Sequence, residues 1–419
     1  MKKQLLICLT KKGMMGIMEN TKNKNVKEII IGIIAFAVII SLAICFGIAY
    51  NNTKLTNNQT NTISESTSNN SKTTNTTSSA VTSNSKNMKI TAGGNYDLSG
   101  EYESITVNTS EEVTLNLNGV EITNSNGPAI NVEKAKKVTI VLSGTNKVTA
   151  TATEDLDGAI YSKADLVFSG TGSLDVKSNY DGIVSKDTLV IKNGTYTINA
   201  DDDGIRGKDS VEILDGSFTI NAGGDGIKSS NDSDTSLGYV SLTGGTFNIT
   251  AKSDGIQGIT KVTISGGTFN INSAEGIEAT YVKIDDGTIN IAASDDGINA
   301  SQKSNISTPT IEINGGNITI KMGQGDTDGI DSNGNIYING GTINITANSP
   351  FDYDGEGKVN GGTVIVNGTE TTTLTNQMMG GGMMGGPQGN MQSGGQFEMN
   401  GNSGMQNRGQ QMNGGQGRR

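Results

Sequence analysis

The tripeptide Asp-Gly-Ile recurs through the middle of the chain, and its spacing limits the possible folds more than any other feature. The acids of these repeats are Asp157 (an Asp-Gly-Ala-Ile variant), Asp181, Asp203, Asp225, Asp254, Glu275 (a glutamate variant), Asp296 and Asp328. The steps between them are 24, 22, 22, 29, 21, 21 and 32 residues. A second marker, Gly-Gly-Thr-Phe-Asn-Ile and its variants, accompanies the first from residue 193 to 366. A period near 22 residues with occasional insertions indicates a solenoid.

Each repeat is built from short β-forming segments. Val, Ile, Thr and Phe dominate the repeats, no 3.6-residue apolar period is present, and Gly, Asn and Asp separate three apolar clusters per repeat. Three inward-facing columns predict three parallel sheets around a narrow aliphatic core, with coils ~4.8 Å apart. The sequence therefore predicts an all-β fold, a single-stranded parallel β-helix over residues 88–375. Ile205, Ile227 and Ile256 are expected to face inward.

The segments that flank the repeats have different compositions. Residues 1–28 are basic, residues 29–50 form an uncharged apolar run long enough to span a bilayer, and residues 51–87 are rich in Ser, Thr and Asn. We expect a cytoplasmic segment, a transmembrane helix or signal anchor, and a disordered linker, with the repeats outside the cell on a single-pass anchor. A cleaved signal peptide and a secreted protein form the alternative. Residues 376–419, rich in Gly, Met and Gln, predict a disordered tail.

Charge and missing residue types exclude several classes of function. The chain has 0 histidines, which removes histidine bases, His-zinc sites and Ser-His-Asp triads. Residues 88–375 contain 38 acidic and 18 basic side chains. This excess argues against nucleic acid and anionic lipid as partners of the repeats. Cations, and molecules that cations can bridge, remain as ligands, and we expect a monomer stabilised by stacking of its coils.

The acids of the Asp-Gly pairs should lie above one another in successive coils, ~4.8 Å apart. Carboxylates at that distance repel by about 1 kcal/mol in water and ~3.5 kcal/mol at an effective dielectric of 20. Two explanations stay open. The pairs serve only as turns, with solvation and raised pKa values absorbing the repulsion, or Ca²⁺ lies between coils on carboxylate and carbonyl oxygens. Doubled and tripled acids favour Ca²⁺. The candidate ligands are Asp157, Asp181, Asp201, Asp202, Asp203, Asp225, Asp254, Asp295, Asp296, Asp326 and Asp328, with the run 201–203 the most favoured site.

A row of lysines follows the turns. Lys163, Lys186 and Lys208 align in successive repeats, each trailed two or one residues later by an aspartate, at positions 165, 187 and 209. Stacked columns of opposite charge would neutralise one another across coils, which is the simpler interpretation. The alternative interpretation is a functional charged strip beside the acidic column.

The repeats resemble a known family. The unit DGI…KD-V-I…GGT-I, the opening VTLNLNGVEITNSNGPAINVEKAKKVTIVLSGTN (113–146) and the closing FDYDGEGKVNGGTVIV (351–366) are similar to the carbohydrate-binding domain-containing proteins of clostridial and related bacteria. The resemblance covers about residues 88–375. It implies a right-handed parallel β-helix like that of pectate lyases, bound calcium, and binding of polysaccharides such as polygalacturonate and cellulose. Glu275 departs from the aspartate column, so the resemblance carries no metal site to that coil.

Three functions follow from the residues and the resemblance together. We expect a surface-tethered, non-catalytic protein that holds acidic polysaccharide through Ca²⁺ bridges and cellulose more weakly, because the chain lacks Trp and its tyrosines do not recur at one coil position. The alternative is a calcium-dependent polysaccharide lyase, with Arg206, Lys186 or Lys208 as the base. A structural surface or spore-layer protein without ligand is the second alternative. The candidate carbohydrate-binding residues are Tyr180, Lys186, Arg206 and Lys208.

Overall fold

A computed structural model describes residues 86–324 and 327–376 of the chain. Within these ranges every regular element is a β-strand, and no helix is long and apolar enough to cross a membrane. The predicted anchor at 29–50, nearly all of the predicted linker and tail, and the candidate ligand Asp326 lie outside the described residues.

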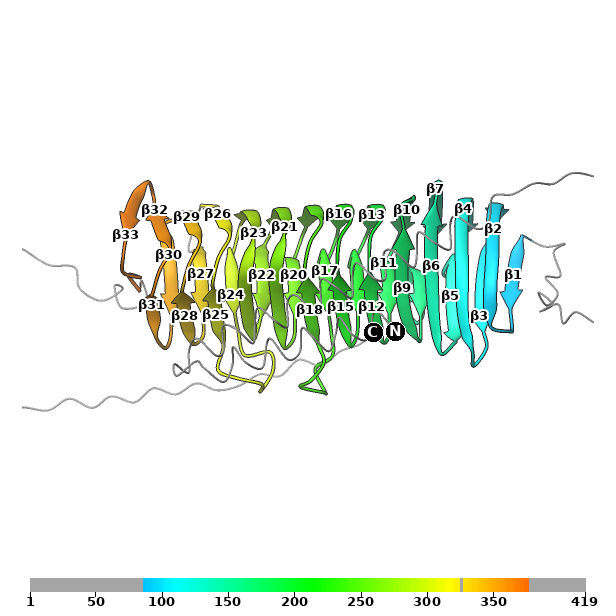
Figure 1. Ribbon diagram of the computed structural model, residues 1–419, viewed down its shortest axis with the longest axis horizontal. Helices are drawn as coiled ribbons and strands as arrows, with labels where there is room; N and C mark the ends of the chain where they lie inside the picture. The colour runs from blue at the N-terminus through cyan, green and yellow to red at the C-terminus, as the bar shows by residue number, and fades with distance from the viewer. Residues whose placement is uncertain (1–85, 325–326, 377–419) are drawn as a thin grey trace, which may run out of the picture. The chain divides into compact units, whose positions relative to one another are not determined.

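The described strands stack in chain order, as Figure 1 shows from β1 in blue to β33 in orange, and form a 12-stranded and a 21-stranded sheet. The pairings between neighbouring coils are parallel, which confirms an all-β parallel solenoid. The 12-stranded sheet contains β1 (Asn87–Ile90), β3 (Ser104–Asn108), β5 (Ile130–Lys134), β8 (Gly158–Ser162), β11 (Asp181–Ser185), β14 (Ile205–Gly207), β17 (Ile227–Ser229), β20 (Asp254–Gly258), β22 (Glu275–Ala279), β24 (Ile298–Ala300), β27 (Asp328–Ser332) and β30 (Ser349–Tyr353).

The 21-stranded sheet consists of two ladders. The first contains β6 (Lys137–Ser143), β9 (Asp165–Gly170), β12 (Thr188–Ile191), β15 (Ser210–Ile213), β18 (Tyr239–Leu242), β25 (Thr310–Ile313), β28 (Asn335–Ile338) and β31 (Gly357–Val359). The second contains β7 (Thr145–Ala150), β10 (Ser173–Ser178), β13 (Thr195–Ala200), β16 (Ser217–Ala222), β19 (Thr246–Ala251), β26 (Asn317–Met322), β29 (Thr342–Thr346) and β32 (Thr363–Val366), with β33 (Thr369–Thr371) antiparallel to β32.

Four long strands join the two ladders, so the prediction of three separate sheets is wrong. Strands β2 (Gly94–Tyr102), β4 (Glu112–Asn124), β21 (Lys261–Ser273) and β23 (Tyr281–Ala293) run through the corner between the ladders. Their pairings shift register at the corner, between residues 264 and 268 in β21. A bulge bends a strand without ending it. The three inward columns of the sequence prediction are nevertheless present.

The inward columns form one aliphatic core. Ile205, Ile227 and Ile256 pair in register on β14, β17 and β20, and each is 0% exposed. The predicted repeat alignment is therefore confirmed at these coils. Burial of such columns in every coil supplies the main stabilisation of a solenoid, whose repeats contact only their neighbours.

An aromatic stack, which the sequence reasoning did not single out, runs through the core of the second ladder. The rings of Tyr196, Phe218, Phe247 and Phe269 lie nearly parallel, with centroids 4.9, 4.7 and 4.6 Å apart. Phe168 closes the stack edge-on at 6.0 Å. Parallel register places identical side chains one coil apart, which is the distance at which rings stack.

The glycine of each Asp-Gly pair is required by close packing and not by a left-handed turn. A Cβ on Gly255 would lie 2.3 Å from Ile271 Cγ2 and 2.7 Å from the carbonyl oxygen of Gly276. Its φ is not positive, whereas Gly267 of the second marker has φ +103°. The sequence interpretation of Asp-Gly as a turn is therefore wrong at this position, because the next coil occupies the space a side chain would need.

Candidate functional site

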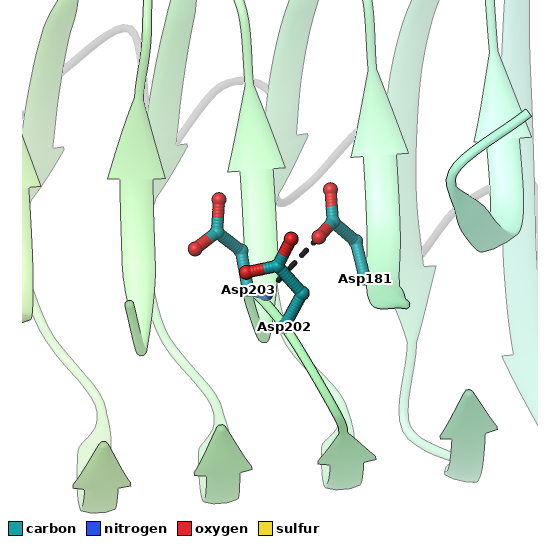
Figure 2. Close-up of side chains that lie close together, drawn as sticks. All are labelled: Asp181, Asp202 and Asp203. Carbon is teal, nitrogen blue, oxygen red and sulfur yellow. Dashed lines mark hydrogen bonds between the residues drawn. The ribbon is translucent and has the colours of Figure 1, made fainter. Parts of the chain in front are cut away.

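In the acidic column, carboxylates accept hydrogen bonds from backbone N–H groups of the coil that follows. The Oδ1 atom of Asp181 accepts the backbone N–H of Asp203 at 3.0 Å, which Figure 2 shows as a dashed line. Asp203 accepts the N–H of Asp225 at 2.8 Å, and Asp225 accepts that of Asp254 at 2.9 Å. All four side chains are buried. Asp181, Asp203 and Asp225 therefore each have one oxygen committed to the next coil, and their other oxygen carries the charge that must be balanced.

Arg206 balances the charge of the first coils. Its Nη2 lies 2.5 Å from Asp157 Oδ2, and its Nε lies 2.7 Å from Asp181 Oδ2 and 3.5 Å from Asp203 Oδ2. Burial lowers the pKa of Arg206, but the attraction of Asp181 and Asp157 outweighs it, so that pKa lies above its ordinary value. The Arg206 side chain is 15% exposed. A half-buried cation shared by three carboxylates is a structural countercharge, and it cannot accept a proton.

Two lysines complete this neutralised part of the column. Lys228 Nζ lies 2.6 Å from Asp225 Oδ2 and 3.6 Å from Asp203 Oδ2. Lys186 Nζ lies 3.1 Å from Asp157 Oδ2. Burial raises the pKa of Asp157, yet the charges of Arg206 and Lys186 reverse the shift and hold it below its ordinary value.

From Asp203 onward, the residue three positions after a column acid sets how much positive charge lies beside the column. Strand pairing stacks these positions in one row on the outer side of the 12-stranded sheet. Along the chain the row reads Arg206, Lys228, Gln257, Glu278, Asn299 and Asp331. The row therefore changes from cations to alternating amides and acids, and the compensation present in the first coils is lost in the later ones.

The first cluster with metal-binding potential is formed by Asp181, Asp202 and Asp203. Their carboxylate oxygens lie within 4.8 Å of one another, and Figure 2 shows them converging where β11 and β14 begin. Asp202 is exposed, and Asp201 is exposed and outside the cluster. Because Arg206 already contacts two of the three carboxylates, this cluster has little need of a further cation.

The second cluster, Asp254, Glu275 and Glu278, has three carboxylates within 4.8 Å of one another and little compensation. Lys303 Nζ contacts Glu278 Oε2 at 2.6 Å, the one ion pair this cluster makes within the described chain. Gln257 donates to Asp254 and, at 3.2 Å, to Glu278. Burial and then the neighbouring carboxylates raise the pKa of Asp254 to about 8 and that of Glu275 to about 7. Three carboxyl groups, two of them buried and that of Glu275 half-buried, thus share one ammonium group.

Acids with raised pKa values are also present in the two coils that follow the second cluster. Burial, followed by neighbouring carboxylates, raises the pKa values of Asp296 and Asp331 to about 7. Asn299 links Asp296 to the second cluster, because its Nδ2 donates to Glu275 Oε2 at 3.1 Å and to Asp296 Oδ2 at 3.3 Å. Asn299 is 7% exposed, and its Oδ1 is buried with no hydrogen-bond partner among the described residues. A buried amide oxygen without a partner is a potential cation ligand.

Comparison with known proteins identifies the family. The profile of the family described as "Carbohydrate-binding domain-containing protein" matches residues 84–329 and 274–416. The chain belongs to this family. A protein of the same description from Acetivibrio thermocellus is 30% identical over 127 residues, which are 27% of this chain and 44% of that relative. A solved structure described as the polysaccharide lyase-like protein from C. thermocellum, a gadolinium derivative, is 36% identical, with a TM-score of 0.44 over 49% of this chain and 87% of that one.

In this member of the carbohydrate-binding domain family, the structure brings two of the four predicted carbohydrate-binding residues together. Lys186 and Arg206 meet at Asp157, and Lys186 also lies 5.5 Å from the ring centroid of Tyr161. No hydrogen bond or ion pair joins the side chain of Lys208 or Tyr180 to them in the described ranges. Lys208 is exposed and Tyr180 is half-buried.

The predicted neutralisation of stacked lysines by the aspartates that trail them is wrong. Within residues 86–324 and 327–376, no ion pair links Lys163, Lys186 or Lys208 to that aspartate column. Lys186 forms an ion pair with Asp157 of the acidic column instead, where its charge balances that of a carboxylate. Asp187 keeps a raised pKa, which burial causes first and Asp165 second.

Of the predicted metal ligands, the structure brings Asp181, Asp202 and Asp203 into the first cluster and Asp254 into the second. Asp295 is exposed and raises the pKa of the neighbouring Asp296. Sequence reasoning missed the role of the fourth residue of each repeat motif. The signal was present, because DGIR, DGIK, DGIQ, EGIE, DGIN and DGID follow one another along the chain.

Proposed function

We propose that this protein is a non-catalytic, calcium-dependent binder of acidic polysaccharide. The observation that carries the proposal is the second cluster, where Asp254, Glu275 and Glu278 converge and Lys303 is the one countercharge among the described residues. Binding of a divalent cation is the direct way to relieve buried carboxylate repulsion while all three groups stay ionised. The favoured ion site thus shifts from residues 201–203, where Arg206 supplies the positive charge.

Ca²⁺ suits this cluster best. It takes six to eight oxygen ligands in flexible geometry, whereas Mg²⁺ demands a near-ideal octahedron and keeps several waters. Asp254, Glu275 and Glu278 would supply carboxylate oxygens, and Asn299 offers its unpaired Oδ1 nearby. Ligand positions that the protein leaves open can accept a carboxylate from a uronate sugar, which would make the ion a bridge between protein and polysaccharide.

An acidic polysaccharide such as polygalacturonate fits this chemistry better than cellulose. Binders of crystalline glucan present flat aromatic strips, and this chain has no Trp. The family description supports carbohydrate binding as such. Of the residues considered as lyase bases, Arg206 and Lys186 are engaged with buried carboxylates, so no observation favours catalysis. We further propose that the solenoid is right-handed and that residues 29–50 tether it to the outside of the cell, or are cleaved on secretion.

A sedimentation assay with insoluble polygalacturonate tests this function. The full-length protein in detergent should bind in 1 mM Ca²⁺ and be released by a chelator. Asp254→Asn/Glu275→Gln should bind poorly at every Ca²⁺ concentration, since two anionic ligands are removed. Asp175→Asn/Asp97→Asn makes the same charge change at exposed positions and should bind like the wild type. Equal binding of the wild type in calcium and in chelator would contradict the proposal.

A further inference from the structure

A groove follows the outer face of β19, β21, β23 and β26, away from the ion pairs described above. One hollow of about 490 Å³ and a second of about 530 Å³ share the lining residues Asn272, Ala292 and Lys321, so they are continuous. Strand pairing stacks these three residues in successive coils. Ala292 has a short side chain between its longer neighbours Asn272 and Lys321 in this row.

A ladder of asparagine amides forms one wall of the groove. Asn270 Nδ2 donates to Asn248 Oδ1 at 3.0 Å, and Asn290 Nδ2 donates to Asn270 Oδ1 at 3.1 Å. All three side chains are exposed. An asparagine has two N–H donors and two acceptor lone pairs, and the two hydrogen bonds of the ladder use about a third of those of the three residues. The remaining donors and acceptors are held in fixed orientation and repeat once per coil, at ~4.8 Å.

Two lysines line the groove. Lys252 and Lys321 both line the second hollow, and both are exposed. Neither forms an ion pair or hydrogen bond through its side chain within residues 86–324 and 327–376. In a solenoid with 38 acidic and 18 basic side chains, two unpaired ammonium groups in one polar groove make it the place where an anion would bind.

We propose that this groove binds one chain of an acidic polysaccharide, laid along the stack of coils. The amides of Asn248, Asn270 and Asn290 would pair with sugar hydroxyls, while Lys252 and Lys321 would pair with the uronate carboxylates. The amide spacing is close to the length of one sugar ring in an extended chain, so each coil meets one sugar. The proposal rests on the proposed function and adds the surface that recognises the sugars.

Other polyanions fit the groove less well. Single-stranded nucleic acid is bound by stacking its bases on aromatic side chains, and no aromatic residue lines either hollow. Lipids and hydrophobic peptides match poorly with a groove that presents exposed amides and two ammonium groups along its length. Two residues of the groove are close in sequence to the second cluster. Lys252 precedes Asp254 by two residues, and Ala274 directly precedes Glu275.

Calorimetric titration of the full-length protein with oligogalacturonate in 1 mM Ca²⁺ tests the groove. Lys252→Gln/Lys321→Gln should weaken binding at least tenfold, because a hydrogen bond to a charged group is worth about 1.5–3 kcal/mol and 1.4 kcal/mol is tenfold. Lys177→Gln/Lys192→Gln is the matched control. Both of its lysines are exposed, and Lys177 lies in the same row of the ladder as Asn199, several coils before the groove. The control should bind like the wild type.

The outcomes separate the two proposals. Unchanged affinity in the groove variant, or equal weakening in both double variants, overturns the groove proposal. If the second-cluster variant Asp254→Asn/Glu275→Gln then still loses binding, the proposed function stands without the groove. If the wild type binds no acidic oligosaccharide in calcium, both proposals fall. The four lysines are exposed, so unchanged melting temperatures confirm that any loss of affinity is local.

Discussion

Raising the pH from 5 to 7.5 in the presence of a chelator should destabilise the solenoid. Burial and neighbouring carboxylates raise the pKa of Asp254 to about 8. In the unfolded chain an aspartate has a pKa of about 3.9. A group with a raised folded pKa binds more protons in the folded state, so stability is lost as the pH rises from the unfolded value to the folded value. Glu275, Asp296 and Asp331 change in the same direction.

The size of the stability loss follows from the pH range over which Asp254 is ionised in the unfolded chain but protonated in the folded protein. Between pH 5 and 7.5 the unfolded Asp254 is ionised while the folded one keeps its proton, and each pH unit costs about 1.4 kcal/mol. Asp254 alone therefore accounts for about 3 kcal/mol. For a domain of this size each kcal/mol moves the melting temperature by roughly 2–4 °C. The chain has 0 histidines, so no imidazole titrates in this window.

Thermal denaturation followed by circular dichroism measures the effect. In chelator the wild type should melt at least about 6 °C lower at pH 7.5 than at pH 5, and Ca²⁺ should restore much of the loss at pH 7.5. Asp254→Asn should flatten the pH dependence and melt higher than the wild type at pH 7.5 in chelator. Asp175→Asn, at an exposed position, should leave the pH dependence unchanged. A wild-type melting temperature that stays constant or rises between pH 5 and 7.5 would refute the reasoning.

Two further predictions concern stability. Arg206→Met removes the cation that Asp157 and Asp181 share and should cost about 3–5 kcal/mol in denaturant titration; a cost like that of the exposed Lys177→Met would show that Arg206 is not a structural countercharge. Gly255→Ala places a Cβ 2.3 Å from Ile271 Cγ2 and should cost about 1–3 kcal/mol. Gly323→Ala, whose Cβ would meet nothing closer than 3.5 Å, is its control, and equal costs would contradict the packing argument.

The coil alignment could be predicted from the sequence because each inward position repeats in type. The isoleucines after the Asp-Gly pairs are apolar, so their stable position in the folded chain is the interior. The burial of Ile205, Ile227 and Ile256 could therefore be predicted directly from the repeat. The joining of two ladders into one sheet could not be predicted, since it depends on whether the chain bulges or breaks at a corner. Gly, Asn and Asp occur at the corner whether the strand bulges and continues or ends there.

The acidic column itself could be predicted, but the balance of charge along it could not be obtained from the acids alone. Register places Arg206 beside acids of three different coils, with Asp157 49 residues away in the sequence. A triple aspartate therefore looked like the strongest cation site, although the structure supplies its countercharge internally. The coil of Glu275 looked weakest by resemblance, yet Glu278 adds a third carboxylate there. Long-range pairing of charges is a property of the fold.

Long-wavelength anomalous diffraction from crystals of the protein grown in Ca²⁺ tests the central claim most directly. We expect an anomalous peak among the carboxylate oxygens of Asp254, Glu275 and Glu278, and no peak beside Asp181 and Asp203, where Arg206 lies. A fully occupied Ca²⁺ between Asp181, Asp202 and Asp203, with Arg206 displaced and the second cluster empty, would contradict it.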